Sequence, residues 1–294
     1  MVLMRRVLVL VLLVAWFSAI AAAQDAAPAE KNFIWRVSKG STDVYLVGSI
    51  HALKEDAYPL PQAFERTFEE AEVLVFEIDL GEMTATAVQL MSAGSLAPGT
   101  TLEQVVGAQT WKELEAHAEE SGFNPSVFSG MKPWMAALTL TAFELSKHGY
   151  LSSSGLDTYF MQRADQAGKE TRALETAEAQ VSLFADLTQE QSRAFLRYTL
   201  RDLELMIPEM EELYIRWRAG DVEYVEHMML EGFEEFPDVF TRMVGDRNRA
   251  WVPQIEELLA GDRDAMVVVG SAHLVGDEGV IELLRKKGYA IERL

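Results

Sequence analysis

The stretch Met266-Val-Val-Val-Gly-Ser-Ala-His273 decides the fold that this sequence predicts. A short β-branched apolar run that a glycine closes is typical of a buried strand. The same arrangement occurs near the other end of the chain, in Val44-Tyr-Leu-Val-Gly-Ser-Ile-His51. Each histidine therefore follows the carboxyl end of a predicted strand, which is where open α/β sheets bind their ligands.

Two Gly-Ser-x-His units predict that two imidazoles meet at one cleft. Glycine at a strand end allows a tight turn and a close approach to the backbone, so Gly48 and Gly270 are candidate site residues themselves. The simpler interpretation is two strand-end turns that contain histidine by coincidence. The chain has only five histidines, so a matched pair in matched contexts favours the functional interpretation.

Two other predicted strands end in a carboxylate. Val73-Leu-Val-Phe76 precedes Glu77, and Thr171-Arg-Ala-Leu174 precedes Glu175. Acids in this position often cap the next helix, which is the structural alternative. We expect instead that both glutamates and both motif histidines lie at one edge of a single sheet, around one cleft.

Three further polar residues are candidates for the site. Asp157 follows the turn at 152–155 and is either a helix cap or a site residue. Arg247 and Asn248 lie at the predicted start of a helix that runs to Leu259, where the helix macrodipole disfavours cations. A surface charge cluster is the simpler interpretation, and a clamp for an anion or oxyanion, which arginine suits, is the functional one.

The order of the segments predicts an α/β fold with a central mixed, mostly parallel sheet. Residues 83–260 are mostly helical and form a large insertion, in which the helical run 177–219 is expected to break near Pro208. A chain of 294 residues can bury a large core in one domain, so we expect residues 32–294 to form a single domain.

The first residues have the layout of a secretory signal peptide. Met1–Arg6 is basic, residues 7–20 are apolar, and Ala21-Ala-Ala23 gives an A-x-A cleavage site, so residues 1–23 are expected to be removed and 24–31 to form a loose leader. An uncleaved anchor is the alternative, but the apolar run is shorter than the ~20 residues of a membrane span. We expect a periplasmic or secreted protein that does not insert into the membrane after cleavage.

The charge and the cysteine count exclude several classes. The formal charge of −20 becomes −22 without residues 1–23, which contain Arg5 and Arg6 and no acid. Such a charge argues against nucleic acid and anionic membranes as partners. It is compatible with a cation site, although acidity also keeps an exported protein soluble. The chain has no cysteine, and therefore no disulfide and no lipoprotein attachment site.

These motifs together resemble the TraB/GumN family, also called TraB/PrgY, whose animal relatives are the Tiki proteases. That family is marked by two Gly-x-x-His motifs, a glutamate and an arginine, which here would be Gly48–His51, Gly270–His273, Glu77 and Arg247. The resemblance covers Phe33 to Leu294. It implies a sheet with helical insertions, related to the erythromycin esterase/ChaN group, and it implies metal-dependent hydrolysis for the Tiki members.

Our first functional hypothesis is an exported metal-dependent hydrolase, peptidase-like, acting on a peptide or small-molecule substrate. Imidazole and carboxylate ligands suit zinc, manganese, cobalt or iron, and a bound metal lowers the pKa of its water to ~7. His51, His273 and a carboxylate would be the ligands. Glu77 or Glu175 would be the third ligand or the general base, and Arg247 would stabilise the oxyanion.

Two alternatives remain open at this point. A non-catalytic periplasmic protein could hold a metal, haem or a peptide signal with the same histidines and would need no general base. A family member that lacks an active metal site is the third interpretation.

Overall fold

The computed structural model describes residues 31–233 and 237–294. The predicted signal peptide and residues 24–30 of the predicted leader lie outside these ranges. Residues Lys31–Leu294 form one compact unit. Within the described ranges, every helix is too short or too polar to cross a membrane.

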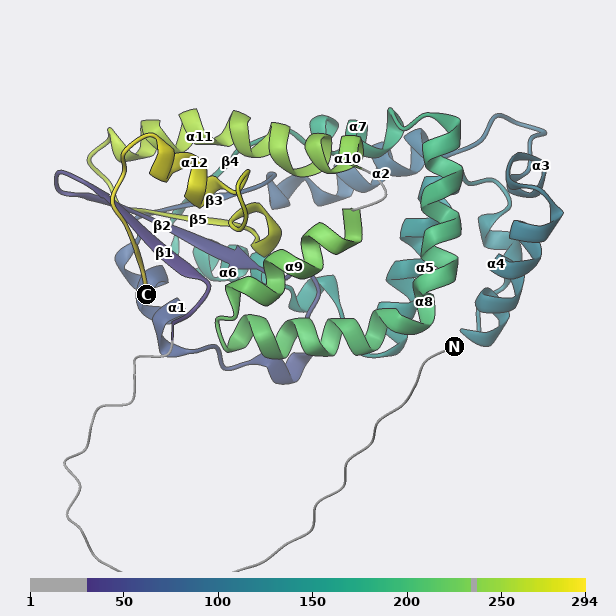
Figure 1. The fold of residues 1–294 in the computed structure, drawn as a ribbon, viewed down its shortest axis with the longest axis horizontal. Helices are drawn as coiled ribbons and strands as arrows, with labels where there is room; N and C mark the ends of the chain where they lie inside the picture. The colour runs from purple at the N-terminus through teal and green to yellow at the C-terminus, as the bar shows by residue number, and fades with distance from the viewer. Residues whose placement is uncertain (1–30, 234–236) are drawn as a thin grey trace, which may run out of the picture. The chain divides into compact units, whose positions relative to one another are not determined.

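A six-stranded sheet in the order β4-β3-β5-β2-β1-β6 forms the centre of the fold. The four strands β2 to β5 pair in parallel, and β1 pairs antiparallel with both β2 and β6 (Figure 1). The prediction of a mixed, mostly parallel sheet is therefore confirmed. The strands are β1 Ile34–Lys39, β2 Thr42–Ser49, β3 Val73–Phe76, β4 Glu170–Ala173, β5 Ala265–Gly270 and β6 Ile291–Arg293.

The register of the parallel strands brings their carboxyl ends to one edge. Ser49 is level with Gly270 in the β2–β5 pair, and Phe76 is level with both Val268 of β5 and Ala173 of β4. All residues of β3 and β5 are buried, as expected for parallel strands that are covered on both faces. The residues that follow these strands therefore emerge side by side.

Four helices cover the two faces of the sheet. In Figure 1, α11 and α12 lie on one face, and α1 and α6 lie on the other. The apolar side of each helix faces the sheet, and the buried residues of α1, for example, are Ala63, Phe64, Thr67 and Phe68. The helices are α1 Gln62–Glu70, α6 Leu156–Ala167, α11 Asp246–Leu259 and α12 Val280–Lys286.

The remaining helices lie between β3 and α11 in the chain, and several of them form a second, smaller core. Its buried members include Leu102 of α3, Leu114 of α4, Leu140 of α5 and Leu196 of α8. These helices are α2 Met83–Ala93, α3 Leu102–Val106, α4 Ala108–Glu120, α5 Pro133–Lys147, α7 Ala177–Ala185, α8 Gln189–Arg218, α9 Val222–Phe233 and α10 Pro237–Phe240.

The structure corrects two local predictions. The helix does not end near Pro208: α8 continues through it and changes direction along its length (Figure 1), and a proline inside a helix ordinarily causes such a kink. Arg247 does not lie at a free helix start either. A π-helical turn, Thr241–Gly245, leads directly into α11, and Gly245 has helical φ and ψ of −62° and −47°.

Gly48 shows how closely the elements approach at the end of β2. The indole Nε1 of Trp217, at the end of α8, donates to the Gly48 carbonyl over 2.8 Å. A Cβ at Gly48 would lie 2.9 Å from Cδ1 of Phe33 and 2.9 Å from Oγ of Ser271. The glycine is therefore needed for close packing between strands and not for a left-handed turn.

We expect Gly48→Ala to lower the free energy of unfolding by about 1–3 kcal/mol, because overpacking of a well-packed core costs roughly that much. Urea denaturation measures this change. Gly130→Ala is the matched control, since a Cβ there meets nothing within 4 Å. Equal stability of the two variants would contradict the packing argument.

Candidate active site

The four predicted strand-end residues lie together. His51, Glu77, Glu175 and His273 follow β2, β3, β4 and β5, respectively. The Nε2 of His51 lies 3.8 Å from Oε1 of Glu77, and the guanidinium of Arg247 contacts Glu77, Glu175 and His273. The structure therefore brings the two Gly-Ser-x-His motifs and both glutamates to one edge of the sheet.

Glu77 lies at the centre of this cluster, with its side chain only 9% exposed. Its Oε1 accepts the Gly270 backbone N–H over 2.7 Å, and its Oε2 accepts from Arg247. Burial alone would raise the pKa of Glu77, but the adjacent histidines, Arg247 and the Gly270 N–H outweigh it and lower the pKa to about 2. Glu77 is therefore a carboxylate at neutral pH.

Arg247 links three of the strand ends. Its Nε donates to both carboxylate oxygens of Glu175 over 3.0 and 3.2 Å, and its Nη2 contacts both glutamates. Its Nη1 lies 2.9 Å from Nε2 of His273 and donates to the Met243 carbonyl over 3.2 Å. Every nitrogen of the guanidinium thus has a partner within the cluster or beside it.

His51 has one anchored nitrogen and one that faces Glu77. Its Nδ1 lies 2.8 Å from Oδ2 of Asp157, whose other oxygen accepts from Ser49 Oγ over 2.7 Å. The Asp157 carboxylate raises the pKa of His51 well above its usual range, and Glu77 adds to the rise. The ring is 61% exposed, so it is the cluster member most accessible to a ligand.

His273 is held in the opposite protonation state. Burial and the nearby Arg247 lower its pKa to about 4, so the ring is neutral at pH 7. Its Nδ1 lies 2.7 Å from Oδ1 of Asn248, whose amide nitrogen donates to the Glu278 carbonyl over 2.8 Å. The amide oxygen therefore accepts from Nδ1, and Nε2 keeps its lone pair toward Arg247.

The structure assigns places to the other predicted candidates. Asp157 is not the cap of α6, which is Gly155, and binds His51 instead. A Cβ at Gly270 would lie 3.0 Å from Nε2 of His51, so this glycine borders the cluster. Gly48 does not, because its neighbours are Phe33 and Ser271.

Two residues of the cluster are not among the site residues predicted from the sequence. Gln180 of α7 donates to Glu77 over 3.2 Å and to Glu175 over 3.1 Å. The ring of Trp251 lies 4.5 Å from the His273 ring, and the Arg247 guanidinium lies 4.7 Å above the same indole. Both residues lie on helices, and only an alignment of related sequences could have singled them out.

The imidazole nitrogens and carboxylate oxygens of the cluster are ligand types that divalent cations bind. Glu77 is ionised, and each imidazole is held at Nδ1 by an oxygen, as is usual for histidines that bind metals. In position, however, no three His, Cys, Asp or Glu residues in the described part of the chain are arranged to hold a metal ion. Binding would require Arg247 to release His273, and His51 to lose its proton.

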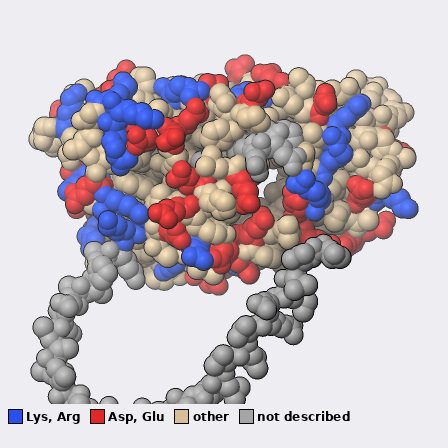
Figure 2. All heavy atoms as spheres, in the orientation of Figure 1, with Lys and Arg blue, Asp and Glu red and all other residues tan. Residues whose placement is uncertain are grey.

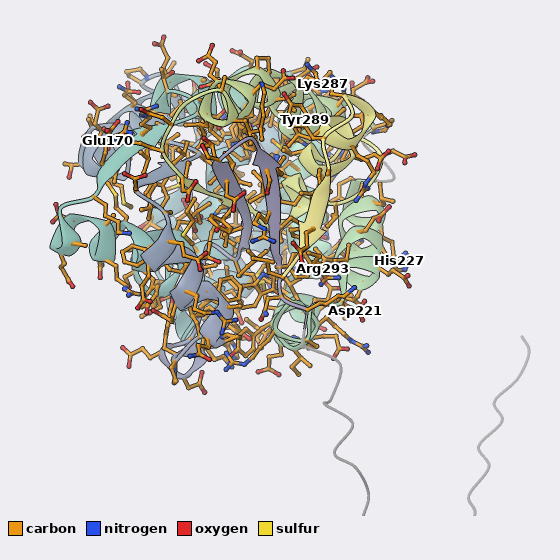
Figure 3. All side chains as sticks on the ribbon, turned by 90° about the vertical axis from the view of Figure 1, so that its left-hand side faces the viewer. Glu170, Asp221, His227, Lys287, Tyr289 and Arg293 are labelled. Atoms are coloured by element: carbon orange, nitrogen blue, oxygen red, sulfur yellow. The ribbon has the colours of Figure 1, made fainter. Side chains whose placement is uncertain are left out.

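Charged side chains of both signs lie on the surface of the molecule. On the face drawn in Figure 2, Asp and Glu side chains gather to the left of a hollow near the middle, and Lys and Arg side chains lie to its right. Figure 3 faces the other end of the parallel strands, where Glu170, the first residue of β4, projects from the surface. Glu170 pairs there with Arg172 and Arg263, and it therefore provides a carboxylate for comparison outside the cluster.

The two histidines predict a pH dependence of stability with opposite signs. His273, with its pKa lowered to about 4, stabilises the fold above the ordinary histidine pKa, and this contribution is lost as the pH falls from 6.5 toward 4. His51, with its pKa raised, stabilises the fold below pH 6.5, and this contribution is lost as the pH rises.

Between about pH 6.5 and pH 5 the free energy of unfolding should fall by about 1.5 kcal/mol less in His273→Gln than in the wild type. Above pH 6.5 we expect the free energy of unfolding of His51→Gln to fall less steeply with rising pH than that of the wild type. Urea denaturation at several pH values measures how the free energy of unfolding of each variant changes with pH. His148→Gln, which removes a histidine paired with Glu144 outside the cluster, is the control. Unchanged slopes in both site variants would contradict the assigned protonation states.

Comparison with known proteins identifies relatives along most of the chain. YbaP of Escherichia coli, which is described as uncharacterized, is 25% identical over 246 residues, covering 84% of this chain and 89% of YbaP. Metalloprotease TIKI1 of Danio rerio is 23% identical over 315 residues, covering 89% of this chain and 63% of TIKI1. Human Metalloprotease TIKI1 is 21% identical over 317 residues, covering 89% and 61%.

No solved structure matches the chain, so the relation to the erythromycin esterase/ChaN group stays a prediction. The profile of the TraB/PrgY/gumN family matches residues 33–293, which include all six strands and every residue of the cluster. The chain therefore belongs to the TraB/PrgY/gumN family.

Proposed function

We propose that this protein is an exported hydrolase that cleaves peptide bonds with the help of a divalent metal ion. The observation that carries the proposal is the meeting of two anchored imidazoles, a buried carboxylate and an arginine at the carboxyl edge of one sheet. The similarity to relatives named metalloproteases supports the reaction class.

In this proposal His51, His273 and Glu77 would hold the metal ion. Glu77 is the acid that lies beside the imidazole of His51 and next to Gly270, whereas Glu175 faces Arg247 and Gln180. A bound manganese, cobalt or zinc ion would polarise the scissile carbonyl and lower the pKa of a water molecule. Asp157 and Asn248 orient the two rings through Nδ1.

In this proposal Arg247 would donate hydrogen bonds to the oxyanion that forms on the substrate carbonyl. It sits in a largely buried position, with its side chain 12% exposed, where a hydrogen bond to an oxyanion is stronger than in water. The Nε of Arg247 donates to both carboxylate oxygens of Glu175. The Nη1 and Nη2 groups are therefore the ones that could donate to a substrate oxygen. The guanidinium lies 4.7 Å from the centre of the Trp251 ring, which covers one of its faces.

With Glu77 as a metal ligand, Glu175 is the candidate for the general base. With Arg247 bound, Glu77 has a pKa of about 2 and is a weak base at neutral pH. Both oxygens of Glu175 accept hydrogen bonds from Arg247, so the guanidinium must leave this carboxylate before it can accept a proton from water. The proposal thus requires that Arg247 moves on substrate binding.

Export is proposed from the first residues of the sequence, because the basic and apolar segments and Ala21–Ala23 have the order of a signal peptide. We expect the mature chain to begin at or near Gln24. Intact-mass measurement on protein from the native host tests this expectation. A mass that includes residues 1–23 would contradict cleavage and favour a membrane anchor.

We expect the mature protein to cleave peptides when manganese, cobalt or zinc is added, and to lose this activity in a chelator. Glu77→Gln should lower kcat by ~10²–10⁴-fold, whether Glu77 acts as ligand or as base, because the amide can neither accept a proton nor carry the charge. The measurement is cleavage of a mixed peptide library, followed by mass spectrometry. Glu170→Gln, at the opposite end of the sheet, should retain full activity.

The alternative of a non-catalytic binding protein gives a different pattern. The many contacts of Arg247 within the cluster favour it, because they leave the site closed in the absence of a ligand. In that case the metal would bind with a dependence on His51 and His273, the His148→Ala control would bind normally, and no peptide would be cleaved. Full peptidase activity in the His51→Ala/His273→Ala double variant would refute the metal mechanism.

A further inference from the structure

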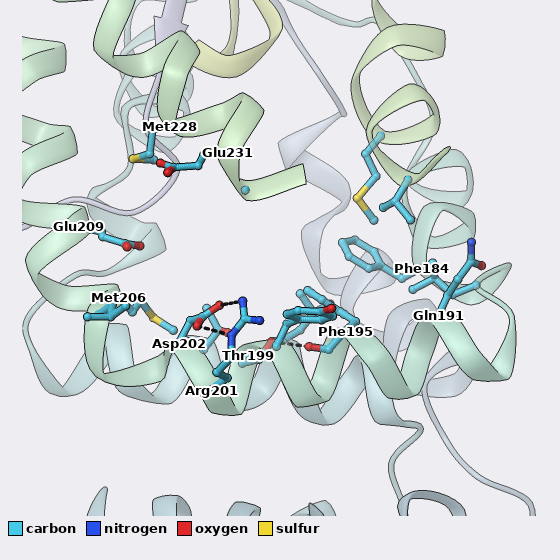
Figure 4. Close-up of a pocket in the computed structure, with 18 residues that line it drawn as sticks. Phe184, Gln191, Phe195, Thr199, Arg201, Asp202, Met206, Glu209, Met228 and Glu231 are labelled. Carbon is cyan, nitrogen blue, oxygen red and sulfur yellow. Dashed lines mark hydrogen bonds and ion pairs between the residues drawn. The ribbon is translucent and has the colours of Figure 1, made fainter. Parts of the chain in front are cut away.

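A concave site lies among the helices, next to the cluster. It has a volume of about 650 Å³ and lies between α5, α7, α8, α9 and the segment that precedes α11. This volume is within the roughly 300–1,000 Å³ range of ligand-binding pockets. Its walls are mainly apolar and include Phe184, Phe195, Tyr198, Met206 and Met243 (Figure 4).

Two helical segments connect this pocket with the cluster. Gln180 of α7 binds Glu77 and Glu175, and Phe184, one turn further along the same helix, lines the pocket. Met243 also lines the pocket, and its carbonyl accepts from Nη1 of Arg247. Because one helical turn spans about 5.4 Å, the pocket wall begins next to the carboxylates of the cluster.

The pocket is apolar toward the cluster and acidic on the other side. Figure 4 shows Phe184 and Phe195 on one side, and Asp202, Glu209 and Glu231 on the other. Arg201, which pairs with Asp202, is the single basic residue among the lining residues. Burial raises the pKa of Glu209, and the neighbouring Asp202 and Glu231 raise it further.

We propose that this pocket binds the peptide segment next to the bond that is cleaved, and that it selects apolar side chains followed by a positive charge. The apolar side chains would lie against Phe184, Phe195 and Met243, close to the cluster. A lysine, an arginine or an amino terminus would lie at the acidic side. This inference rests on the proposed peptidase function and adds a substrate class to it.

Charge complementarity distinguishes this occupant from a lipid. A fatty acid or a phospholipid could fill the apolar part, but its anionic head would meet Asp202, Glu209 and Glu231 with only Arg201 to balance them. A cation gains from the same three acids. The aromatic and methionine side chains on the apolar part also suit varied apolar residues, since methionine adapts its shape to its contacts.

The test separates binding from cleavage by using Glu77→Gln protein, which retains the pocket. Three fluorescein-labelled peptides of about eight residues are compared by fluorescence anisotropy: one with Leu and Phe beside Lys, one with Glu in place of Lys, and one with Ser in place of Leu and Phe. We expect the first peptide to bind about tenfold more tightly than either of the others, which corresponds to about 1.4 kcal/mol for each feature.

Two matched pairs of variants place the binding in the pocket. Leu205 and Ile215 are both exposed residues of α8, at 54% and 57%, but only Leu205 lines the pocket. Leu205→Asp should weaken binding of the first peptide about tenfold, and Ile215→Asp should not. Glu209→Lys should reverse the preference between the Lys and Glu peptides, and Glu204→Lys, outside the pocket lining, should leave it unchanged.

The outcomes distinguish this inference from the proposed function. Selective binding without cleavage by the wild-type protein would keep the pocket assignment and refute the hydrolase. Equal binding of the three peptides, or no effect of Leu205→Asp, would overturn the pocket assignment even if peptides are cleaved. Tighter binding of laurate than of the first peptide would overturn it in favour of an acyl ligand.

Discussion

The ion pairs of Arg247 with Glu77 and Glu175 are the interaction on which the site and its surroundings depend. Both carboxylates are nearly buried, at 9% and 12% exposure, and two such charges near each other are costly without a cation between them. Arg247 offsets this cost and is itself held by the Met243 carbonyl and by Nε2 of His273. One guanidinium thereby ties α11 to the ends of β3, β4 and β5.

The register of the parallel strands explains why these residues meet at all. β5 lies between β2 and β3, so the turn after Gly270 is flanked by the turns after Ser49 and Phe76. The sequence separates His51 from His273 by more than two hundred residues, yet both rings border Gly270, because parallel strands in register end at the same edge. The absence of a side chain at Gly270 lets His51 and Glu77 approach the strand end.

This geometry also shows how much could be predicted from the sequence. The ends of β2, β3 and β5 follow from short apolar runs, so the positions of His51, Glu77 and His273 could be anticipated. The strand before Glu175 has a weaker signal, because its four residues are all exposed. Gln180 and Trp251 could not be anticipated, because the orientation of a helix depends on its packing and not on its local pattern. The sequence predicts a helix that starts near Arg247 and ends at Leu259, but it does not predict the π-helical turn before it, since the residues of that turn have no distinctive composition. A break near Pro208 is expected from the sequence, but α8 runs through this proline from Gln189 to Arg218.

The sheet and the helical insertion contribute different parts of the same site. The two histidines and the two glutamates follow the ends of the strands. The helices contribute the residues that line the pocket. Two helical stretches, α7 and the π-helical turn with the start of α11, each place a polar group in the cluster and an apolar side chain in the pocket: Gln180 with Phe184, and Arg247 with Met243. The two members of each pair are four residues apart, so they lie about one helical turn from each other. Phe184 and Met243 of the pocket wall are therefore joined through Gln180 and Arg247 to the same two carboxylates, Glu77 and Glu175.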